Sequence, residues 1–267
     1  MTTMLKLSHV TKTFNKGTVT EKRALTGVNL ELAEGDFVTV IGGNGAGKST
    51  LLNMIAGVYP LDAGTIELDG TDVSRMTEPQ RAKFLGRVFQ DPMRGTAADM
   101  QIAENLALAK RRGQKRGLAW GISAEEKEEY PKLLATLDLG LETRMSAKVG
   151  LLSGGQRQAL TLLMATLTNP KLLLLDEHTA ALDPKTAKKV LDLTEQIVTE
   201  RGLTTLMITH NMNDAIRLGN RLIMMHEGNV IYDVRGEEKK SLTVPDLLQK
   251  FEEVSGGELA NDRMLLS

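Results

Sequence analysis

A glycine-rich segment constrains the fold more than any other part of this 267-residue chain: Gly42-Gly43-Asn44-Gly45-Ala46-Gly47-Lys48-Ser49-Thr50. It matches the pattern G-x-x-x-x-G-K-[ST] and lies between a predicted strand, Phe37–Ile41, and a predicted helix, Lys48–Val58. Glycines in such a loop let backbone N–H groups surround phosphate oxygens, and the N-terminus of the following helix adds a partial positive charge. We expect Lys48 to contact the β- and γ-phosphates of a nucleotide, and the Ser49 hydroxyl to ligate Mg²⁺. The segment therefore predicts a phosphate site on an α/β core.

An acidic pair far downstream adds the expectation of nucleotide hydrolysis. Four consecutive leucines, Leu172–Leu175, predict a strand buried on both faces, and Asp176 and Glu177 follow at its C-terminal end. Open α/β sheets place their ligands at this edge. We expect Asp176 to hold Mg²⁺, directly or through its water shell, and Glu177 to orient and deprotonate the attacking water. For this pair alone an acidic turn is the alternative, but the glycine-rich loop favours the catalytic interpretation.

The remaining elements of the core are predicted from the periodicity of the apolar residues. Helices are predicted at Gln156–Thr168 and after Asp183-Pro184, where aspartate can cap the helix and proline suits its first position. Strands that alternate with helices indicate a mainly parallel sheet. The other predicted strands are Met4–Val10, Leu25–Leu32, Thr65–Leu68, Leu172–Asp176 and Thr204–Thr209, with a hairpin of Arg221–His226 and Asn229–Val234 that turns at Glu227-Gly228.

Residues 90–152 have a different pattern, with almost no strand-like run. Ile102–Ala109 and Ala124–Leu137 are predicted helices, and the second opens with a capping box S-x-x-E that begins at Ser123. Because Pro131 lies inside this second helix, we expect the helix to kink or divide there. The interval is therefore interpreted as a helical lobe inserted into the α/β core.

The composition excludes several classes of protein. The chain has 33 Lys and Arg against 34 Asp and Glu, whereas nucleic-acid binders usually carry a basic surplus. The sequence contains no run of about 18 consecutive apolar residues, the minimum for a helix that spans a membrane. Its N-terminus also lacks the apolar core of a signal peptide. Cysteine is absent, which excludes disulfides and thiolate chemistry. The basic segment Lys110–Arg116 could form a nucleic-acid or lipid-headgroup patch, but we favour a solvated loop balanced by nearby glutamates.

A short segment indicates which kind of ATPase this is: Leu152-Ser153-Gly154-Gly155-Gln156, placed 20 residues before Leu172. It resembles the LSGGQ signature of the ATP-binding cassette (ABC) ATPases, and the resemblance covers about residues 4–235 in the family's order. Four further positions are similar to motifs of that family. They are the Q-loop glutamine Gln90, the D-loop aspartate Asp183, the switch histidine His210 and the adenine-stacking aromatic residue Phe14.

The resemblance implies a site that is completed by a second cassette. The Ser153 hydroxyl and the N–H groups of Gly154 and Gly155 would face the γ-phosphate of ATP held by the other subunit, so that ATP joins two cassettes. The expected catalytic residues are Glu177, His210 and Gln90, and the expected Mg²⁺ ligands are Ser49, Gln90 and Asp176. The expected nucleotide-binding residues are Phe14, Gly42, Asn44, Gly45, Ala46, Gly47, Lys48, Ser49, Thr50, Ser153, Gly154, Gly155, Gln156 and Asp183.

His178 departs from the family, which usually has proline after the catalytic glutamate. Two interpretations remain open: a tolerated substitution with no role, which we favour, and an imidazole that titrates near the phosphates. The run LDEHTAALDP is similar to bacterial cassettes paired with importers for small solutes, among them aromatic amino acids.

The predicted fold is an α/β phosphate-loop NTPase core with a mainly parallel sheet, an N-terminal antiparallel β portion and an inserted helical subdomain. We expect an ABC ATPase domain at residues 1–235, with the helical subdomain at about residues 91–160, and a short C-terminal helical tail at residues 236–267.

The expected function is that of the ATP-hydrolysing subunit of a multi-subunit ABC transporter. It would import a small solute such as an amino acid through separate permease chains, and an export or lipoprotein-release system is the alternative. The expected cofactors are ATP and Mg²⁺. The expected partners are a second cassette, identical or not, integral membrane permease subunits and a solute-binding protein, without nucleic acid. The expected location is the cytoplasmic face of the cell membrane, as a peripheral subunit.

Overall fold

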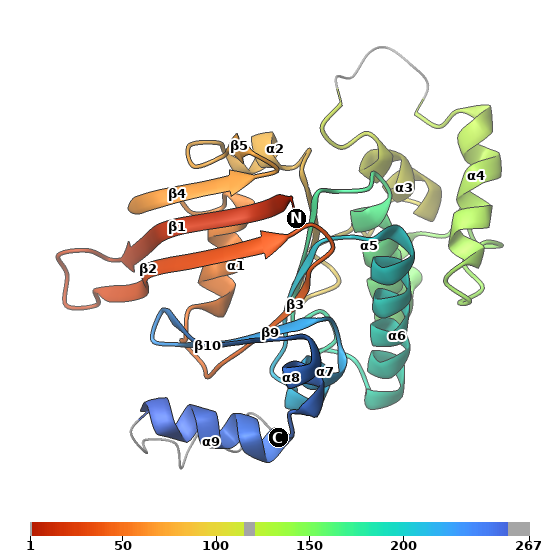
Figure 1. The fold of residues 1–267 in the computed structure, drawn as a ribbon. Helices are drawn as coiled ribbons and strands as arrows, with labels where there is room; N and C mark the ends of the chain where they lie inside the picture. Colours follow the sequence, from red (N-terminus) through yellow and green to blue (C-terminus); the bar gives the residue numbers. More distant parts are fainter. Residues whose placement is uncertain (1, 115–120, 256–267) are drawn as a thin grey trace. The chain divides into compact units, whose positions relative to one another are not determined.

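The computed structural model describes residues 2–114 and 121–255 and contains two compact units (Figure 1). The first unit is formed by the residues up to Arg81 together with those from Gly202 onward, and the second by Ala82–Arg201. Within the described ranges, no helix combines the length and the apolar character needed to cross a bilayer. Lys115 and Arg116 of the basic segment and residues 256–267 of the expected tail lie outside these ranges.

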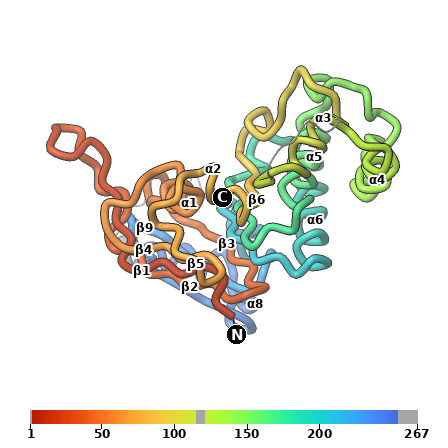
Figure 2. Tube along the Cα trace, turned by 90° about the horizontal axis from the view of Figure 1, so that it is seen from above, coloured from red at the N-terminus to blue at the C-terminus, as the bar shows by residue number. Residues whose placement is uncertain are grey.

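The expected N-terminal antiparallel portion is confirmed as a four-stranded sheet in the first unit, in the order β2-β1-β4-β5. Alternating apolar side chains explain its register, since Leu7 pairs with Leu30 on one side and with Ile66 on the other, and all three are buried. Figure 2 shows the connection between β1 and β2 projecting away from this sheet. The strands are β1 (Thr3–Phe14), β2 (Lys22–Ala33), β4 (Ala63–Leu68) and β5 (Thr71–Asp72).

The parallel strands of the first unit surround β3 (Phe37–Ile41), which lies between β8 (Thr205–Ile208) and β9 (Arg221–His226). β10 (Asn229–Arg235) runs antiparallel to β9. All five residues of β3 are buried, as expected for an apolar strand with parallel neighbours on both sides. The predicted bounds of β3 and β9 are confirmed.

The helices of the first unit include α1, which follows β3, and the two helices of the C-terminal tail. α1 (Lys48–Ala56) ends two residues earlier than predicted, because Gly57 takes a left-handed conformation with φ of 82° and closes the helix. In the tail, Leu247 and Phe251 of α9 pack into an apolar cluster with Met212 and Met224. The other helices of this unit are α2 (Glu78–Arg81), α7 (Met212–Arg217), α8 (Gly236–Ser241) and α9 (Val244–Ser255).

The second unit contains β6 (Leu85–Val88) paired in parallel with β7 (Leu172–Asp176). β6 was not predicted, because its sequence Leu-Gly-Arg-Val has no apolar alternation. The glycine is nevertheless required, since a Cβ on Gly86 would lie 2.5 Å from the carbonyl oxygen of Ala165. The helices of the unit, gathered in Figure 2, are α3 (Ile102–Lys110), α4 (Ala124–Ala135), α5 (Gly154–Thr166) and α6 (Pro184–Arg201), with a 3₁₀ turn at Val149–Leu151.

The expected division of α4 at Pro131 is wrong, because α4 is one helix of 12 residues. Its predicted capping box is confirmed: the Ser123 hydroxyl accepts the Glu126 N–H, and the Glu126 carboxylate accepts the Ser123 N–H. Tyr130 and Leu134, which lie on the two sides of Pro131 in the sequence, are both fully buried in the apolar core of the helices. Packing on both sides thus maintains the helix despite the hydrogen bond that proline cannot donate.

Restoring the backbone donor at this position should stabilise the second unit. We expect Pro131→Ala to raise the free energy of unfolding by about 1–2 kcal/mol, because the new N–H can bond to the Lys127 carbonyl while the more flexible unfolded chain offsets part of the gain. Denaturant unfolding followed by circular dichroism measures the difference, with the exposed Lys132→Ala as control. A lower stability of Pro131→Ala would show that the proline ring itself is needed for packing.

Candidate functional site

The phosphate loop between β3 and α1 has no room for a side chain at two of its glycines. A Cβ on Gly42 would lie 2.2 Å from the carbonyl oxygen of Met225, and a Cβ on Gly47 would lie 2.5 Å from that of Ala24. Both glycines also have positive φ angles, 149° and 99°. The path of the loop against β9 and β2 therefore depends on glycine at both positions.

The phosphate loop is also hydrogen-bonded to the turn between β9 and β10. The Gly228 N–H donates to the Ala46 carbonyl at 3.0 Å, and the Gly228 carbonyl accepts the Thr26 N–H at 3.1 Å. The phosphate loop, β2 and the β9–β10 turn, which are distant in sequence, are thus held together by backbone hydrogen bonds.

Helix α1 begins at this loop without a side chain that caps its N-terminus. Gly47 is the N-cap residue, and the first turn contains no acidic residue. By contrast, α4 and α5 are capped by the hydroxyls of Ser123 and Ser153. Because a helix has no internal acceptor for its first N–H groups, those of α1 can be satisfied by phosphate oxygens, which the helix dipole also favours.

Lys48 supplies the charge at this helix start. Its Nζ donates to the carbonyl oxygens of Gly42, at 2.7 Å, and Gly43, at 3.2 Å, and the side chain is buried. The ammonium group is therefore held by the loop that would receive the phosphates. Beside the loop lies a hollow of about 490 Å³, lined by its residues 43–46 and by the side chains of Lys22, Arg23, Thr26, His226 and Glu227.

The basic residues of this hollow were missed by the sequence analysis. Lys22 and Arg23 start β2 and belong to no motif, and only the strand arrangement brings them to the phosphate loop. His226 belongs to none of the predicted motifs, yet it ends β9 and lines the same hollow. Nothing in the local sequence signals this, because the contact depends on which strands are neighbours.

The other predicted residues of the first unit lie at the ends of its strands or at the start of α1. Asn44, Gly45 and Ser49 are exposed, and Thr50 is half-buried. His210 is exposed and follows β8 by two residues. Phe14 ends β1 and packs edge-to-face against Tyr59, with ring centroids 5.2 Å apart, so its stacking on adenine stays a prediction.

In the second unit, the acidic pair and the Q-loop glutamine lie at one edge of the β6–β7 pair. Because Val88 pairs with Leu175, the positions two residues further along each strand, Gln90 and Glu177, share the C-terminal edge. Gln90 is exposed, and Asp176 and Glu177 are half-buried. The structure therefore brings these three predicted residues together within the unit.

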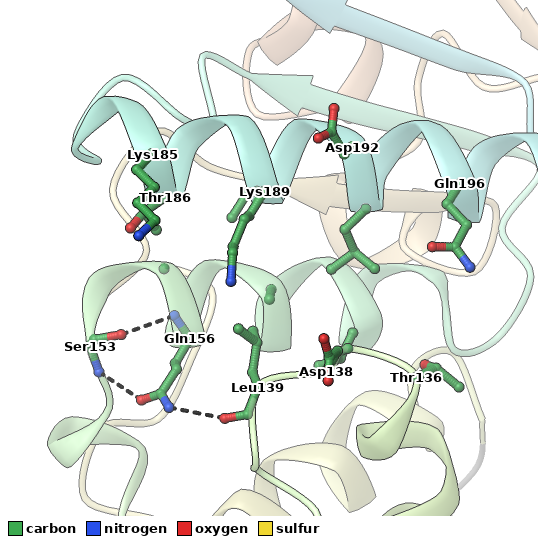
Figure 3. Close-up of a pocket in the computed structure, with 15 residues that line it drawn as sticks. Thr136, Asp138, Leu139, Ser153, Gln156, Lys185, Thr186, Lys189, Asp192 and Gln196 are labelled. Carbon is green, nitrogen blue, oxygen red and sulfur yellow. Dashed lines mark hydrogen bonds between the residues drawn. The ribbon is translucent and has the colours of Figure 1, made fainter.

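The signature segment forms the start of α5, two residues before the predicted start. The Ser153 hydroxyl accepts the Gln156 N–H at 3.3 Å, and the Gln156 side-chain oxygen accepts the Ser153 N–H at 3.2 Å. Figure 3 shows that the side-chain amide of Gln156 also donates to the Leu139 carbonyl, at 3.2 Å. The side chain of Gln156 thus shapes the segment, while the proton of the Ser153 hydroxyl can still be donated to an anion.

The signature segment and the D-loop aspartate are brought together by the close approach of α5 and α6. A Cβ on Gly155 would lie 2.1 Å from the Thr186 methyl group, so only glycine allows this approach. Asp183 caps α6, as predicted, by accepting the Thr186 N–H at 3.1 Å. Hydrogen bonds from the side chain and backbone of Thr186 lower the pKa of Asp183. A cavity of about 710 Å³ lies along these helices and is lined by Ser153, Gln156, Lys185 and Lys189 (Figure 3).

His178 is buried and hydrogen-bonded. Its Nε2 lies 3.0 Å from the Thr194 hydroxyl oxygen on α6, and the residue is 2% exposed. Burial lowers the pKa of His178 to about 4. The ring is therefore neutral between pH 5.5 and 7.5, which argues against an imidazole that titrates beside the phosphates in that range.

The predicted site residues thus form two sets, one in each compact unit. The first unit holds Phe14, the phosphate loop and His210, and the second holds Gln90, the acidic pair, the signature segment and Asp183. The family of the chain is shown by comparison with known proteins. The sequence profile of the ABC transporter family matches residues 25–180, more than half of the chain. The chain belongs to the ABC transporter family.

Similar ABC proteins match nearly end to end. A tyrosine transport ATP-binding protein of Clostridioides difficile is 44% identical over 249 residues, 93% of this chain and 99% of the relative. The lipoprotein-releasing system ATP-binding protein LolD 1 of Caulobacter vibrioides is 34% identical over 239 residues, 88% of this chain and 97% of the relative. A dimeric, post-hydrolysis structure of the cassette MJ0796 bound to ADP and Pi has a TM-score of 0.74 and 32% identity, over 87% of this chain and 98% of that one. The predicted fold class is confirmed, and this chain is an ABC ATPase.

The phosphate loop yields a direct test of nucleotide binding. Lys48→Ala should abolish tight ATP binding and hydrolysis, because it removes the localised charge on the β- and γ-phosphates. Isothermal titration calorimetry with ATP measures the affinity, and Lys16→Ala, an exposed lysine in the β1–β2 connection, is the control. Wild-type affinity in Lys48→Ala would show that ATP binds elsewhere.

The lowered pKa of His178 yields a test by stability. Between pH 6.5 and about 4 the unfolded chain binds a proton on this ring that the folded chain does not, so the free energy of unfolding falls as the pH falls. Between pH 7 and pH 5 the wild type should lose about 2 kcal/mol more than His178→Gln, whose side chain does not titrate. Urea unfolding at the two pH values measures this difference, and equal losses would mean that the ring is accessible to protons in the fold.

Proposed function

We propose that this ABC ATPase is the energy-supplying subunit of an importer for a small solute such as an amino acid, with separate permease chains. The observation that carries this proposal is its similarity to the tyrosine transport ATP-binding protein, which extends over 93% of the chain at 44% identity. The proposal includes a solute-binding protein as a further partner.

Nucleotide binding in this proposal begins at the phosphate loop. The uncapped N–H groups at the start of α1 and the Lys48 ammonium would receive the β- and γ-phosphates. Lys22 and Arg23 line the same hollow and would add positive charge beside the phosphates. Phe14, at the end of β1, would stack on adenine.

Hydrolysis in this proposal depends on groups at the C-terminal edge of the β6–β7 pair and on His210, which follows β8. Glu177 would orient the attacking water and accept its proton, Gln90 would contact that water, and His210 would contact the γ-phosphate. Ser49, Gln90 and Asp176 would hold Mg²⁺, and their hydroxyl, amide and carboxylate oxygens fit the preference of this ion for oxygen ligands. When bound, Mg²⁺ neutralises charge on the β- and γ-phosphates.

The two helix starts that can bind phosphate suggest how a dimer would assemble. α1 carries the phosphate loop and α5 carries the signature, with Ser153, Gly154 and Gly155 at its first turn. We propose that the ATP held by one subunit at α1 is contacted by the α5 start of the other, with Asp183 beside it. Such an arrangement is two-fold symmetric and closes on two ATP molecules.

The proposed location is the cytoplasmic face of the cell membrane, where the cassettes would bind the permease chains. An export or lipoprotein-release system is the second candidate, supported by the 34% identity to the lipoprotein-releasing protein. Proteoliposomes containing the cassette and its permease chains would separate the two. ATP-driven uptake of labelled amino acid, tyrosine first, supports the importer, and ATP-driven movement of substrate in the opposite direction supports the alternative.

The composite site can be tested with the catalytic glutamate. Glu177→Gln keeps the size of the side chain but cannot accept a proton, so hydrolysis should fall by roughly 10²–10⁴-fold while ATP binding persists. With ATP no longer consumed, the ATP-bound dimer should accumulate. Size-exclusion chromatography with light scattering, with and without Mg-ATP, measures the mass.

The control for this experiment is a second substitution in the signature. Adding Ser153→Arg to Glu177→Gln should abolish the dimer, because a bulky side chain occupies the place of the γ-phosphate, while each phosphate loop still binds ATP. The composite site is refuted if Glu177→Gln stays monomeric at saturating ATP and its cassettes also fail to close when the permease is supplied.

A further inference from the structure

Glu177 has a backbone conformation that a glutamate does not favour. Its φ angle is 43°, in the left-handed region, where contacts of the Cβ disfavour most residues other than glycine, asparagine and aspartate. Such a conformation persists only where the surrounding structure determines it from both sides. On the N-terminal side this is done by β7, whose residues Leu172–Leu175 are fully buried and paired with β6.

On the C-terminal side, the next residue is anchored in the interior of the unit. His178 is buried, and its Nε2 lies 3.0 Å from the hydroxyl oxygen of Thr194, a fully buried residue of α6. The same hydroxyl oxygen lies 2.8 Å from the Val190 carbonyl oxygen. Two consecutive hydrogen bonds, from His178 to Thr194 and from Thr194 to Val190, therefore connect the residue after Glu177 to the backbone of α6.

The direction of these hydrogen bonds follows from the number of protons. A carbonyl oxygen can only accept, so the single hydroxyl proton of Thr194 is donated to Val190. The Thr194 oxygen must then accept from His178, which places the ring proton on Nε2. A neutral imidazole carries a single ring proton, so Nδ1 of the buried His178 ring is unprotonated.

The turn after β7 also contains backbone hydrogen bonds of its own. Its backbone hydrogen bonds, from the Ala180 N–H to the Glu177 carbonyl and from the Leu182 N–H to the Thr179 carbonyl, close the turn on itself. The hydrogen bond of His178 instead ties the turn to a helix of 18 residues that begins at Pro184. It can therefore fix the position of Glu177 relative to α6.

We propose that His178 is a positioning residue, whose buried hydrogen bond to Thr194 fixes the turn after β7 to α6 and holds Glu177 in the left-handed conformation required for catalysis. This proposal rests on the role of Glu177 as the base. A positioning role for His178 differs both from a tolerated substitution without a role and from an imidazole that titrates near the phosphates.

The test removes the acceptor rather than the histidine. Thr194→Val has nearly the same shape but leaves the His178 N–H without an acceptor, whereas Thr194→Ser keeps the hydroxyl. In single-turnover hydrolysis of Mg-ATP by the full chain, Thr194→Val should lower the rate by about tenfold, the effect of one buried donor left unsatisfied, and Thr194→Ser should restore it to within about twofold. ATP affinity should be unchanged, because the phosphate loop lies in the other unit.

A matched control separates positioning from general stability. Thr166 on α5 is also fully buried, and its hydroxyl donates to the Leu162 carbonyl at 3.0 Å without a histidine partner. Thr166→Val should lower the melting temperature about as much as Thr194→Val but leave the hydrolysis rate within about twofold of the wild type. Equal rates for the two valine variants would overturn the proposal.

A double variant distinguishes failure of this proposal from failure of the proposed base. If Glu177→Gln alone hydrolyses ATP at the wild-type rate, the role of Glu177 is refuted and the positioning proposal is refuted with it. If Glu177→Gln is inactive, adding Thr194→Val should cause no further loss of rate, because the group that was positioned is no longer a base. A further loss of similar size would show that Thr194 acts through another residue and would overturn the proposal.

A spectroscopic measurement keeps the proposal testable if a valine variant fails to fold. Long-range ¹⁵N–¹H correlation spectra of the wild-type chain should show the His178 ring with its proton on Nε2, with the resonance assigned from its loss in His178→Gln. A proton on Nδ1 would mean that Nε2 cannot donate to Thr194, and this would overturn the proposal.

Discussion

The close contact of the phosphate loop with neighbouring backbone is the constraint on which the nucleotide site depends. At Gly42 and Gly47 the carbonyl oxygens of Met225 and Ala24 occupy the space that a Cβ would need. These contacts bring β2 and β9 against the loop, and with them the basic side chains of Lys22 and Arg23. The same contacts orient the start of α1, so that one steric requirement for glycine positions both the uncapped helix and the charges around it.

The parts of the fold that could be predicted are those encoded by neighbouring residues. Four leucines in β7 and the apolar run of β3 predict buried strands, and the capping residues Ser123 and Asp183 mark helix starts. The phosphate loop and the signature segment were found because their chemistry needs a fixed order of residues. Each of these signals lies within a window of about ten residues.

Other features depend on contacts between distant segments, which a single sequence does not show. β6 contains a glycine because α5 packs against it, and α4 stays one helix because Tyr130 and Leu134 are buried on both sides of its proline. The basic residues of the hollow follow from strand order alone. The two helix starts that we propose as phosphate sites also differ in a way that the motifs do not show. α1 has no side-chain cap, whereas α5 is capped by its own Ser153 and Gln156.

The hydrogen bond between the Gly228 N–H and the Ala46 carbonyl has a practical consequence. The donor lies in a hairpin turn more than 180 residues away in sequence, yet its acceptor is in the middle of the phosphate loop. The amide hydrogen of Gly228 can exchange with solvent deuterium only when this bond opens. Its exchange rate therefore provides an intrinsic, label-free measure of how often the phosphate loop separates from the sheet.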